Sequence, residues 1–350
     1  MELTAIKGDG NVVAKRIRFV HMGFGPMGAM VCKLACEKNG LELVAALEMV
    51  NLGKDVGEVV NLGKKLGVLL SNDVNATLAK KPDILVNTTM SSLARVKDQL
   101  IPFIKAGVNV VSTCEELSYP WETAPKIATE LDTLAKRHKV TVLGTGVNPG
   151  FTMDTFPIVM TGVSQKVEHI EVARIQDGGS RRLPFQKKIG AGCTPAEFAD
   201  LKKKGTVRHV GLRQSADMIA AAIGWKIDEY SETIDPIIAK TSVSSGFITV
   251  RVGQVAGVEQ IAIARMKSKE IIKMVFQAYL GAPESYDAVR LTGVPSMEVV
   301  IKGGTPGDIA TASMAVNAIP RVVNAPPGLI TMKDLPPVHV YSGNYGALVS

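Results

Sequence analysis

The chain has 350 residues, of which 46% are hydrophobic, 21% charged and 5% aromatic, and its formal net charge is +7. This length is typical of two domains that each bury a core, and the composition excludes a disordered chain. The basic residues are scattered along the sequence. The positive charge therefore indicates an anionic cofactor or substrate and no nucleic-acid partner.

The N-terminus and the cysteines indicate the compartment. The first residues lack a basic segment followed by a long apolar stretch, and no apolar run approaches the about 18 residues that a membrane span needs. None of the four cysteines has the spacing of a metal site or of a disulfide framework. We therefore expect a cytoplasmic protein with reduced thiols, without a membrane partner and without a metal.

The first part of the chain predicts a parallel sheet. From Arg16 to about Thr145, short β-branched runs alternate with longer helical patterns, as in successive βαβ units. With right-handed crossovers these elements form a doubly wound Rossmann sheet, which we assign to residues 1–150. The expected strands are 17–22, 43–48, 67–70, 83–87, 108–112 and 140–144, and the expected helices are 27–38, 92–106 and 125–138.

A glycine-rich turn with the pattern G-x-G-x-x-G follows the first expected strand and precedes a helix. In dinucleotide-binding sites the first glycine permits a tight turn, the second admits the pyrophosphate, and the third lets the helix approach the strand. The helix N-terminus then meets the phosphate charge. We expect the whole turn to bind NAD or NADP: Gly23, Phe24, Gly25, Pro26, Met27 and Gly28.

Glu48 ends the second expected strand, where an acidic residue hydrogen-bonds the adenosine ribose in such folds. Its charge would oppose a 2′-phosphate and favour NAD, although nearby Lys54 leaves NADP open. The alternative is an ordinary charged residue at a strand end. Thr88 and Thr89 follow the fourth strand, so they either contact the nicotinamide-side ribose and phosphate or cap the next helix.

Two adjacent carboxylates, Glu115 and Glu116, follow the fifth expected strand. The carboxyl ends of parallel strands meet at one edge of a sheet, so these side chains lie near the expected nicotinamide. Ser112 with Glu115, or Thr113 with Glu116, also has the spacing of a helix capping box. The residues alone therefore leave capping and acid–base catalysis equally open.

The sixth expected strand ends in the segment 144–154, which is rich in glycine and contains the turn Asn148-Pro149-Gly150. Such turns let the backbone come close to a ligand. The chain also crosses between the two expected domains here, and clefts between domains are common ligand sites. We interpret the segment as a hinge that lines the site.

The second part of the chain alternates polar and apolar residues in long segments with few helices, which predicts an antiparallel sheet. A turn at 303–307 leads into an Ala-rich helix from 308 to about 323, which we expect to pack on the first domain. The expected units are 1–150, 151–306 and 307–350. The expected strands are 167–174, 234–241, 247–255, 259–267, 271–280, 288–291 and 297–301, with covering helices at 195–204 and 213–223.

Four motifs carry a family resemblance: 112–120 (Ser-Thr-Cys-Glu-Glu-Leu-Ser-Tyr-Pro), 144–154, 208–212 (Arg-His-Val-Gly-Leu) and the region 303–320. Together they resemble the 2,4-diaminopentanoate dehydrogenases and related native amine dehydrogenases, over nearly the full chain. The resemblance implies an α/β architecture similar to that of the dihydrodipicolinate reductases. This comprises a Rossmann domain, an α+β substrate domain whose open mixed sheet also mediates homodimer formation, and a C-terminal helix that returns to the first domain.

The resemblance also implies an activity, the NAD(P)-dependent oxidative deamination of an amine to a ketone and ammonia, reversible as reductive amination. The implied substrate is 2,4-diaminopentanoate or a related amine. The catalytic glutamate of the family corresponds to Glu115, with Glu116 as the less favoured choice. Asn148 would serve the cofactor, and the remaining pocket residues would be Tyr119, Val147, Thr152 and Phe156.

A diamino-acid substrate needs a cation for its carboxylate. We expect Arg182 and His209 to contact the substrate, and the other candidate cations are Arg181, Lys187 and Lys188. Two alternative functions are weaker. A dihydrodipicolinate reductase-like imine reductase would carry paired histidines and a Lys-Asp-Ala-Pro-Ser-Gly-Thr run, which are absent. The two carboxylates argue against a catalytically silent dinucleotide-binding regulator.

Overall fold

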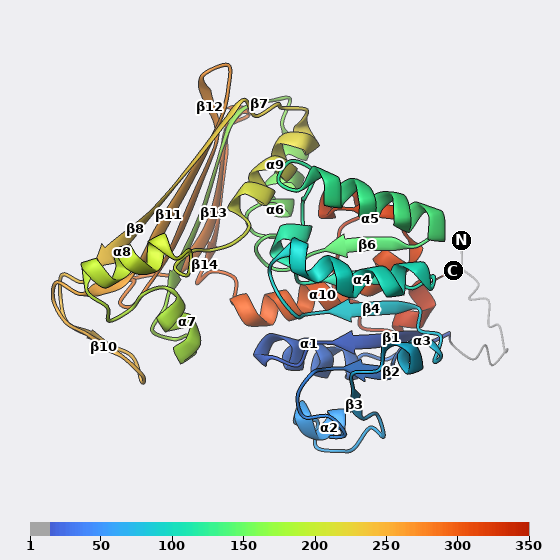
Figure 1. The fold of residues 1–350 in the computed structure, drawn as a ribbon. Helices are drawn as coiled ribbons and strands as arrows, with labels where there is room; N and C mark the ends of the chain where they lie inside the picture. Colours follow the sequence, from blue (N-terminus) through green and yellow to red (C-terminus); the bar gives the residue numbers. More distant parts are fainter. Residues whose placement is uncertain (1–14, 350) are drawn as a thin grey trace, which may run out of the picture.

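The computed structural model describes residues 15–349, which form two sheets connected by a crossing segment and by a long helix near the C-terminus (Figure 1). The N-terminal segment on which the expectation about targeting rests lies outside the described residues. Within residues 15–349, no helix is long and apolar enough to cross a membrane.

The first sheet is parallel and has the order β15-β6-β5-β4-β1-β2-β3. Its short apolar strands are buried on both faces, as parallel sheets require. The strand order reverses between β1 and β4, and ligands bind outside the carboxyl ends of the strands at such a point. The strands are β1 Ile17–Met22, β2 Leu41–Leu47, β3 Leu70–Ser71, β4 Ile84–Asn87, β5 Asn109–Ser112, β6 Thr141–Gly144 and β15 Gly328–Ile330.

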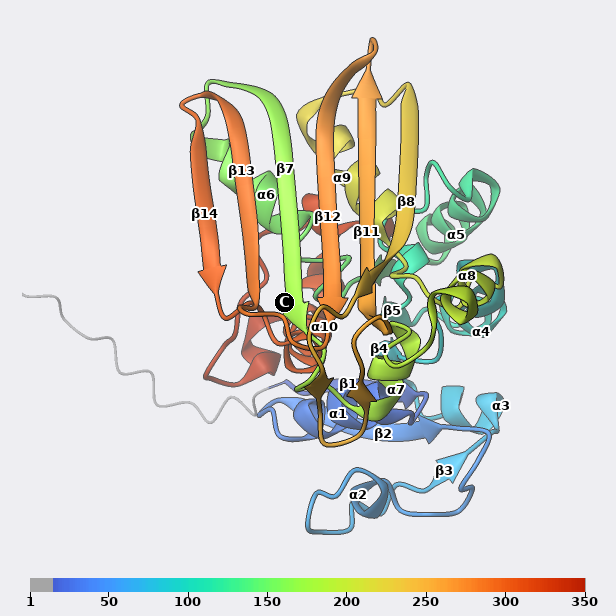
Figure 2. The same ribbon diagram turned by 90° about the vertical axis from the view of Figure 1, so that its left-hand side faces the viewer.

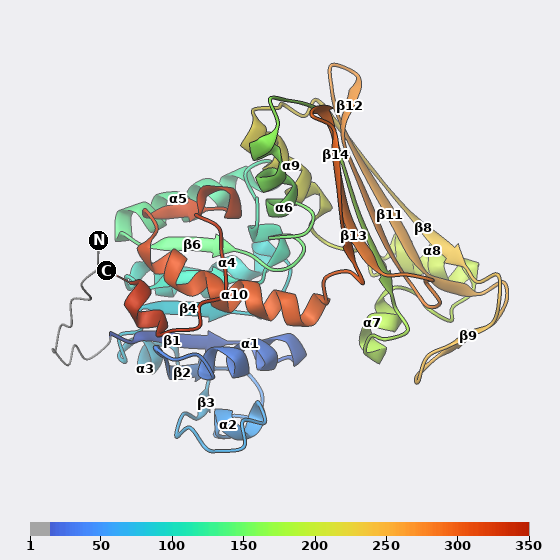
Figure 3. The same cartoon turned by 180° about the vertical axis from the view of Figure 1, so that it is seen from behind.

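Alternate side chains of these strands enter two separate cores. Val20 and its neighbours pack under α4 and α5, whereas Phe19 and its neighbours pack under α1 and α10. Figure 3 shows α1 and α10 together on one face of the sheet. The helices of this part are α1 Pro26–Cys36, α2 Val56–Val59, α3 Val74–Leu78, α4 Leu93–Lys105, α5 Pro125–His138 and α10 Gly307–Asn324.

The second sheet has the order β14-β13-β7-β12-β11-β8 and is mixed, because β7 and β12 are parallel while the other pairs are antiparallel. Helices α6 Thr155–Met160 and α9 Leu212–Ile223 lie on its inner face, and no helix of residues 15–349 covers the outer face (Figure 2). The strands are β7 Lys166–Asp177, β8 Glu229–Ile238, β11 Val255–Met266, β12 Lys269–Tyr279, β13 Tyr286–Val294 and β14 Met297–Lys302.

The predicted fold class is confirmed, with a parallel sheet flanked by helices and a second, mixed sheet. The strand predicted at 247–255 is wrong. A separate ribbon of β9 Val243–Ser244 and β10 Thr249–Val250 ends there, and a turn at Gly253, with φ of 84°, precedes β11. Two short helices at the crossing and beside the sheets, α6 and α7 Leu183–Lys188, have no counterpart in the sequence prediction, whereas α8 Pro195–Lys203 does.

Candidate active site

The glycine turn between β1 and α1 has the shape that its pattern predicts. Gly23 has a φ of 95°, and a Cβ at Gly28 would lie 2.0 Å from the Gly23 carbonyl oxygen, so both positions require glycine. A Cβ at Gly25 would meet nothing within 4 Å. Helix α1 begins at Pro26 without a side-chain cap. Its first N–H groups and the open surface at Gly25 therefore fit an anionic group.

The side chains of His21 and Thr88 both contact the backbone of this turn. The Thr88 hydroxyl donates to the Gly23 carbonyl at 2.8 Å, and His21 Nε2 lies 3.0 Å from the same oxygen. Burial lowers the pKa of His21 to about 4, so the ring is neutral near pH 7. Thr89 donates to Gln99 Oε1 at 2.7 Å, and the N-cap residue of α4 is Ser92, whose own side chain makes no capping hydrogen bond. Neither threonine therefore caps α4.

A cavity of about 200 Å³ lies beside the turn, at the carboxyl end of β2. The Glu48 carboxylate borders it and accepts hydrogen bonds from the backbone N–H groups of Phe24, at 2.6 Å, and Met49, at 2.7 Å. Thr89 lines both this cavity and the next one. The two cavities are therefore neighbours on either side of Thr89, just after the end of β4.

A second cavity, of about 320 Å³, lies between the carboxyl ends of the first sheet and the inner face of the second. We call it the central cavity. The first sheet contributes Thr88, Thr113 and Glu115, and the crossing segment contributes Val147 and Asn148. The central cavity thus combines the predicted reactive edge with residues from the second half of the chain.

The two adjacent glutamates have different positions. Glu115 begins the short helix η1 Glu115–Leu117 and lines the central cavity, where burial raises the pKa of its carboxyl group. Glu116 instead accepts a hydrogen bond from the backbone N–H of Leu93, in the first turn of α4, at 2.8 Å. Glu116 therefore caps a neighbouring helix, and Glu115 is available for chemistry.

The Asn148-Pro149-Gly150 turn is held by a buried acid. Asp154 accepts from the Gly150 N–H at 2.8 Å and from the Ser215 hydroxyl of α9 at 2.8 Å. The side-chain amide of Asn148 donates to Met153 Sδ at 3.0 Å, while its Oδ1 is buried without a hydrogen-bond partner among residues 15–349. This acceptor at the central cavity points to a donor on a ligand.

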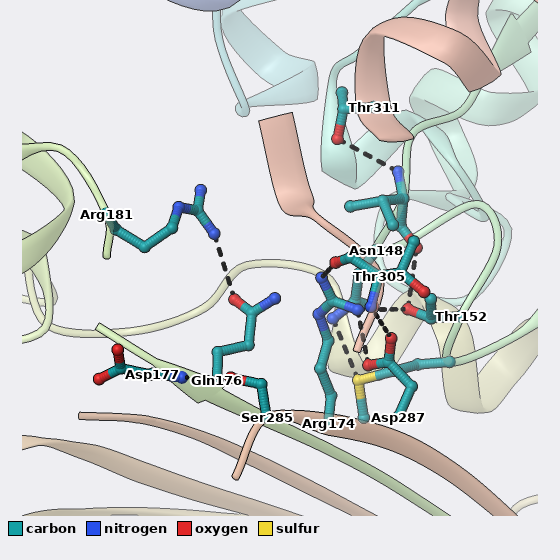
Figure 4. A network of polar contacts seen from close by, with 12 residues as sticks. Asn148, Thr152, Arg174, Gln176, Asp177, Arg181, Ser285, Asp287, Thr305 and Thr311 are labelled. Atoms are coloured by element: carbon teal, nitrogen blue, oxygen red, sulfur yellow. Dashed lines mark hydrogen bonds and ion pairs between the residues drawn. The ribbon is translucent and has the colours of Figure 1, made fainter. Parts of the chain in front are cut away.

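Asp287, Arg174, Phe276 and Gln260 face one another across four adjacent strands on the inner face of the second sheet. Arg174 is 2% exposed and donates to Asp287 Oδ1 at 2.6 Å and to the Thr305 carbonyl at 2.8 Å (Figure 4). Because the Asp287 carboxylate offsets the charge of Arg174, this row of side chains can be buried in the protein. We call these four residues the polar floor of the site.

His209 lies flat on Phe276, with ring centroids 4.5 Å apart and an interplanar angle of 17°. Gln260 holds its backbone by accepting from the His209 N–H at 2.8 Å and donating to its carbonyl at 2.9 Å. Burial, with nearby Lys188 and Arg174, lowers the pKa of His209 to about 3. His209 is therefore neutral, and its Nε2 has no partner among the described residues.

The cations expected from the sequence separate into two groups. Arg181, Lys188 and His209 line the central cavity. Arg182 borders a neighbouring cavity and pairs with Asp308 at 3.0 Å, and Lys187 lines neither cavity.

Three other expected pocket residues lie outside the lining of the central cavity. Tyr119 borders a separate cavity of about 170 Å³ near α9. Thr152 is buried and lies 3.5 Å from Arg174 Nη1, and Phe156 stacks on Phe151 with centroids 6.0 Å apart. None of these three residues therefore has a surface in the central cavity.

Sequence reasoning missed Arg174, Gln260 and Thr311. Thr311 of α10 accepts from the Val147 N–H at 3.3 Å and lines the central cavity. Arg174 follows Ile170 and Val172 on the inward positions of β7, so a charged residue at a position expected to be apolar was an available signal. Thr311 sits in an Ala-rich helix, where one hydroxyl gives no comparable signal.

Two family models match the chain. The model of the 2,4-diaminopentanoate dehydrogenase C-terminal domain matches residues 151–349, and the model of the dihydrodipicolinate reductase N-terminus matches residues 17–114. The two matches include strands β1 to β5 and the whole second sheet, whereas β6 and the cavity residues Glu115, Val147 and Asn148 lie between the matched ranges.

Individual relatives agree with these matches. The 2,4-diaminopentanoate dehydrogenase of Acetoanaerobium sticklandii is 32% identical, over 96% of this chain and 98% of that protein. An amine dehydrogenase of Streptomyces virginiae is 24% identical, over 91% and 96%. The solved structure of the amine dehydrogenase of Mycobacterium smegmatis is 27% identical, superposes with a TM-score of 0.81, and covers 93% of this chain and 97% of that one.

Proposed function

This chain belongs to the 2,4-diaminopentanoate dehydrogenase family, and from that premise we propose that it oxidatively deaminates a small amine to a ketone and ammonia with a nicotinamide dinucleotide. The reaction is reversible as reductive amination. The observation that carries the proposal is the position of Glu115, a half-buried carboxylate at the central cavity, beside a sheet edge suited to a dinucleotide.

Glu115 acts as the acid–base group. Its carboxylate accepts a proton from the substrate ammonium, which frees the nitrogen lone pair, and it then orients the water that adds to the resulting iminium carbon. Burial, which raises the pKa of Glu115, makes proton return to the departing ammonia easier. When bound, the nicotinamide cofactor takes up the hydride from the amine carbon.

The residues of the first sheet fit such a cofactor. The open surface at Gly25 and the uncapped start of α1 suit the pyrophosphate, and the cavity beside Glu48 suits the adenosine. The Asn148 Oδ1 acceptor suits the carboxamide N–H₂ of the nicotinamide. We propose NAD over NADP, because the Glu48 carboxylate would repel a ribose 2′-phosphate.

The central cavity also suits a substrate with a carboxylate. Lys188 lines it and makes no ion pair within 4.0 Å among the described residues, unlike Arg174 and Arg181, which pair with Asp287 and Asp308. His209 is neutral and can only accept through Nε2 if its other nitrogen carries the proton. We therefore propose that Lys188 binds the carboxylate of the substrate and that His209 Nε2 accepts a hydrogen bond from an N–H group of the substrate. 2,4-Diaminopentanoate or a related amino acid carries both groups.

The outer face of the second sheet supports a homodimer. A row of small or apolar side chains crosses its strands from β14 to β8, and a row of charged residues runs beside it. The row consists of Val300, Ala288, Ala173, Val275, Ile261 and Thr233. An apolar band of this kind on a face without helices fits a second copy of the same face across a twofold axis.

The division of the chain and its compartment are also part of the proposal. We assign residues 1–150 to the cofactor, 151–306 to substrate and dimer formation, and 307–350 to the returning segment. The packing of α10 on α1 supports the last boundary. The four cysteines are free thiols in the described residues, which supports the cytoplasm.

The test is an absorbance assay of NADH or NADPH oxidation with ammonia and ketones, and of the reverse reaction with 2,4-diaminopentanoate and simple amines. The proposal expects oxidation that requires both ammonia and ketone. Cofactor binding without turnover under every combination would instead favour a regulator, and would contradict the proposed activity.

A further inference from the structure

Another cavity, of about 380 Å³, adjoins the central cavity on the side of α10. We call it the side cavity. Gln176, Arg181, Gly307 and Asp308 line both cavities. The wall between the two spaces is therefore made of side chains from the end of β7, the following loop and the start of α10.

The guanidinium of Arg181 is the main part of this wall. It donates to Asp308 Oδ1 at 3.0 Å and lies over the ring of Phe185, 4.3 Å from its centroid. A Cβ at Gly307 would lie 2.8 Å from Arg181 Nη1, so the glycine lets the guanidinium approach the backbone of α10. Figure 4 shows Arg181 extended toward Gln176 at the edge of the polar network.

The lining of the side cavity is chemically mixed. Met30 and Ile309 supply apolar surface, Ser180 and Ser285 supply hydroxyls, and the segment 303–307 supplies backbone. The Arg182 charge is already paired with Asp308, and the Asp177 carboxylate, which also lines the cavity, accepts hydrogen bonds from the backbone N–H groups of Gly179 and Gly281. This environment suits an uncharged chain with a terminal hydroxyl better than it suits a second charged group.

We propose that the side cavity is a second substrate subsite, which takes the uncharged distal chain of an amine or ketone, and that Arg181 sets the length limit by closing it. The proposal rests on the proposed deamination, because the reacting carbon lies in the central cavity beside Glu115. Removing the Arg181 side chain joins the two spaces without touching Glu115, Asn148 or the glycine turn.

The test compares reductive amination of a short ketone, pentan-2-one, with that of a long one, 8-hydroxyoctan-2-one. In Arg181→Ala we expect the ratio of kcat/KM, long over short, to rise about tenfold or more, as hydrophobic extension into new space allows. Lys187→Ala is the matched control. It removes a positive charge a few residues away but lines neither cavity, so the ratio should stay at the wild-type value.

A second variant separates volume from charge. Arg181→Lys keeps the charge but replaces the guanidinium with a smaller ammonium group, so it should raise the ratio by less than Arg181→Ala does. If circular dichroism shows that Arg181→Ala is unfolded, Arg181→Lys serves as the test in its place. An unchanged ratio in folded Arg181→Ala or Arg181→Lys overturns the proposal while deamination stands. A wild-type protein inactive with 2,4-diaminopentanoate and with every ketone would overturn the proposed function first.

Discussion

At the scale of single residues, the role of a side chain in the site depends on which contacts its backbone position allows it to make. Glu115 and Glu116 are chemically identical neighbours, yet only Glu115 lines the central cavity, whereas the Glu116 carboxylate accepts a hydrogen bond from the N-terminus of α4. The residue pattern could not separate them, because capping and catalysis require the same side chain at the same spacing. The contact to Leu93, distant in sequence, decides between them.

Glu48 should control the choice of cofactor. Glu48→Ser removes a negative charge from the edge of the 200 Å³ cavity, so the preference for NADH over NADPH should fall by about tenfold, which corresponds to about 1.4 kcal/mol. Fluorescence titration with each cofactor measures both affinities. Glu58→Ser, on the exposed surface of α2, is the control. Equal affinities in Glu48→Ser and the wild type would remove Glu48 from the ribose site.

His21 should make stability depend on pH. Its pKa is lowered by burial to about 4 in the folded protein and is about 6.5 in an unfolded chain. Between these values the unfolded state binds more protons, so the free energy of unfolding falls as pH drops from about 6.5 to 4, by about 3 kcal/mol. Urea unfolding at pH 7 and pH 4.5 measures the loss. The loss should be smaller in His21→Gln, and an equal loss would contradict this cause.

At the scale of elements, the residue pattern predicted the bounds of helices and strands well where the structure of a segment depends mainly on nearby residues in the sequence. The predicted bounds 17–22 and 125–138 agree with β1 and α5. In contrast, β15 was missed because its three residues follow a proline-rich segment and gain their order from pairing with β6, almost 190 residues earlier. Likewise, the 247–255 segment looks continuous, but the positive φ of Gly253 turns the chain within it.

Asp154 should link the hinge turn to α9. It is buried, and it accepts from Gly150, Thr155 and Ser215. Asp154→Asn places an N–H₂ group opposite these donors, so we expect the free energy of unfolding to fall by about 2 kcal/mol, measured by urea titration. Thr161→Ala, which removes a single hydroxyl contact at the end of α6, is the control. A stability equal to the wild type would mean that Asp154 does not hold the turn.

At the scale of the whole molecule, the candidate active site is formed by residues of both sheets. The first sheet and its glycine turn could be predicted from the sequence, because a strand, a turn and a helix adjacent in sequence form them. The polar floor could not, because Asp287, Arg174, Phe276 and Gln260 meet only through strand registers of the second sheet. The expected pocket residue Tyr119 is near Glu115 in sequence but borders a different cavity.

The outer face should form the dimer contact. Val275 lies near the middle of the apolar row, so Val275→Asp places a charge where the twofold partner would pack. Sedimentation velocity should show a dimer for the wild type and a monomer for this variant. Val163→Asp, at an exposed position outside this face, should remain dimeric. A wild-type monomer, or a dimeric Val275→Asp, would contradict the assignment of this face.

The most direct test of the whole account is the rate of ammonia-dependent NADH or NADPH oxidation in the wild type, Glu115→Gln and Glu116→Gln, with cofactor affinity measured on the same samples. The account predicts that Glu115→Gln binds cofactor normally but loses most of its turnover, by a factor of about 100 or more. Glu116→Gln should lose stability and keep its turnover, because its carboxylate caps α4. A Glu115→Gln protein that turns over at the wild-type rate would contradict the account.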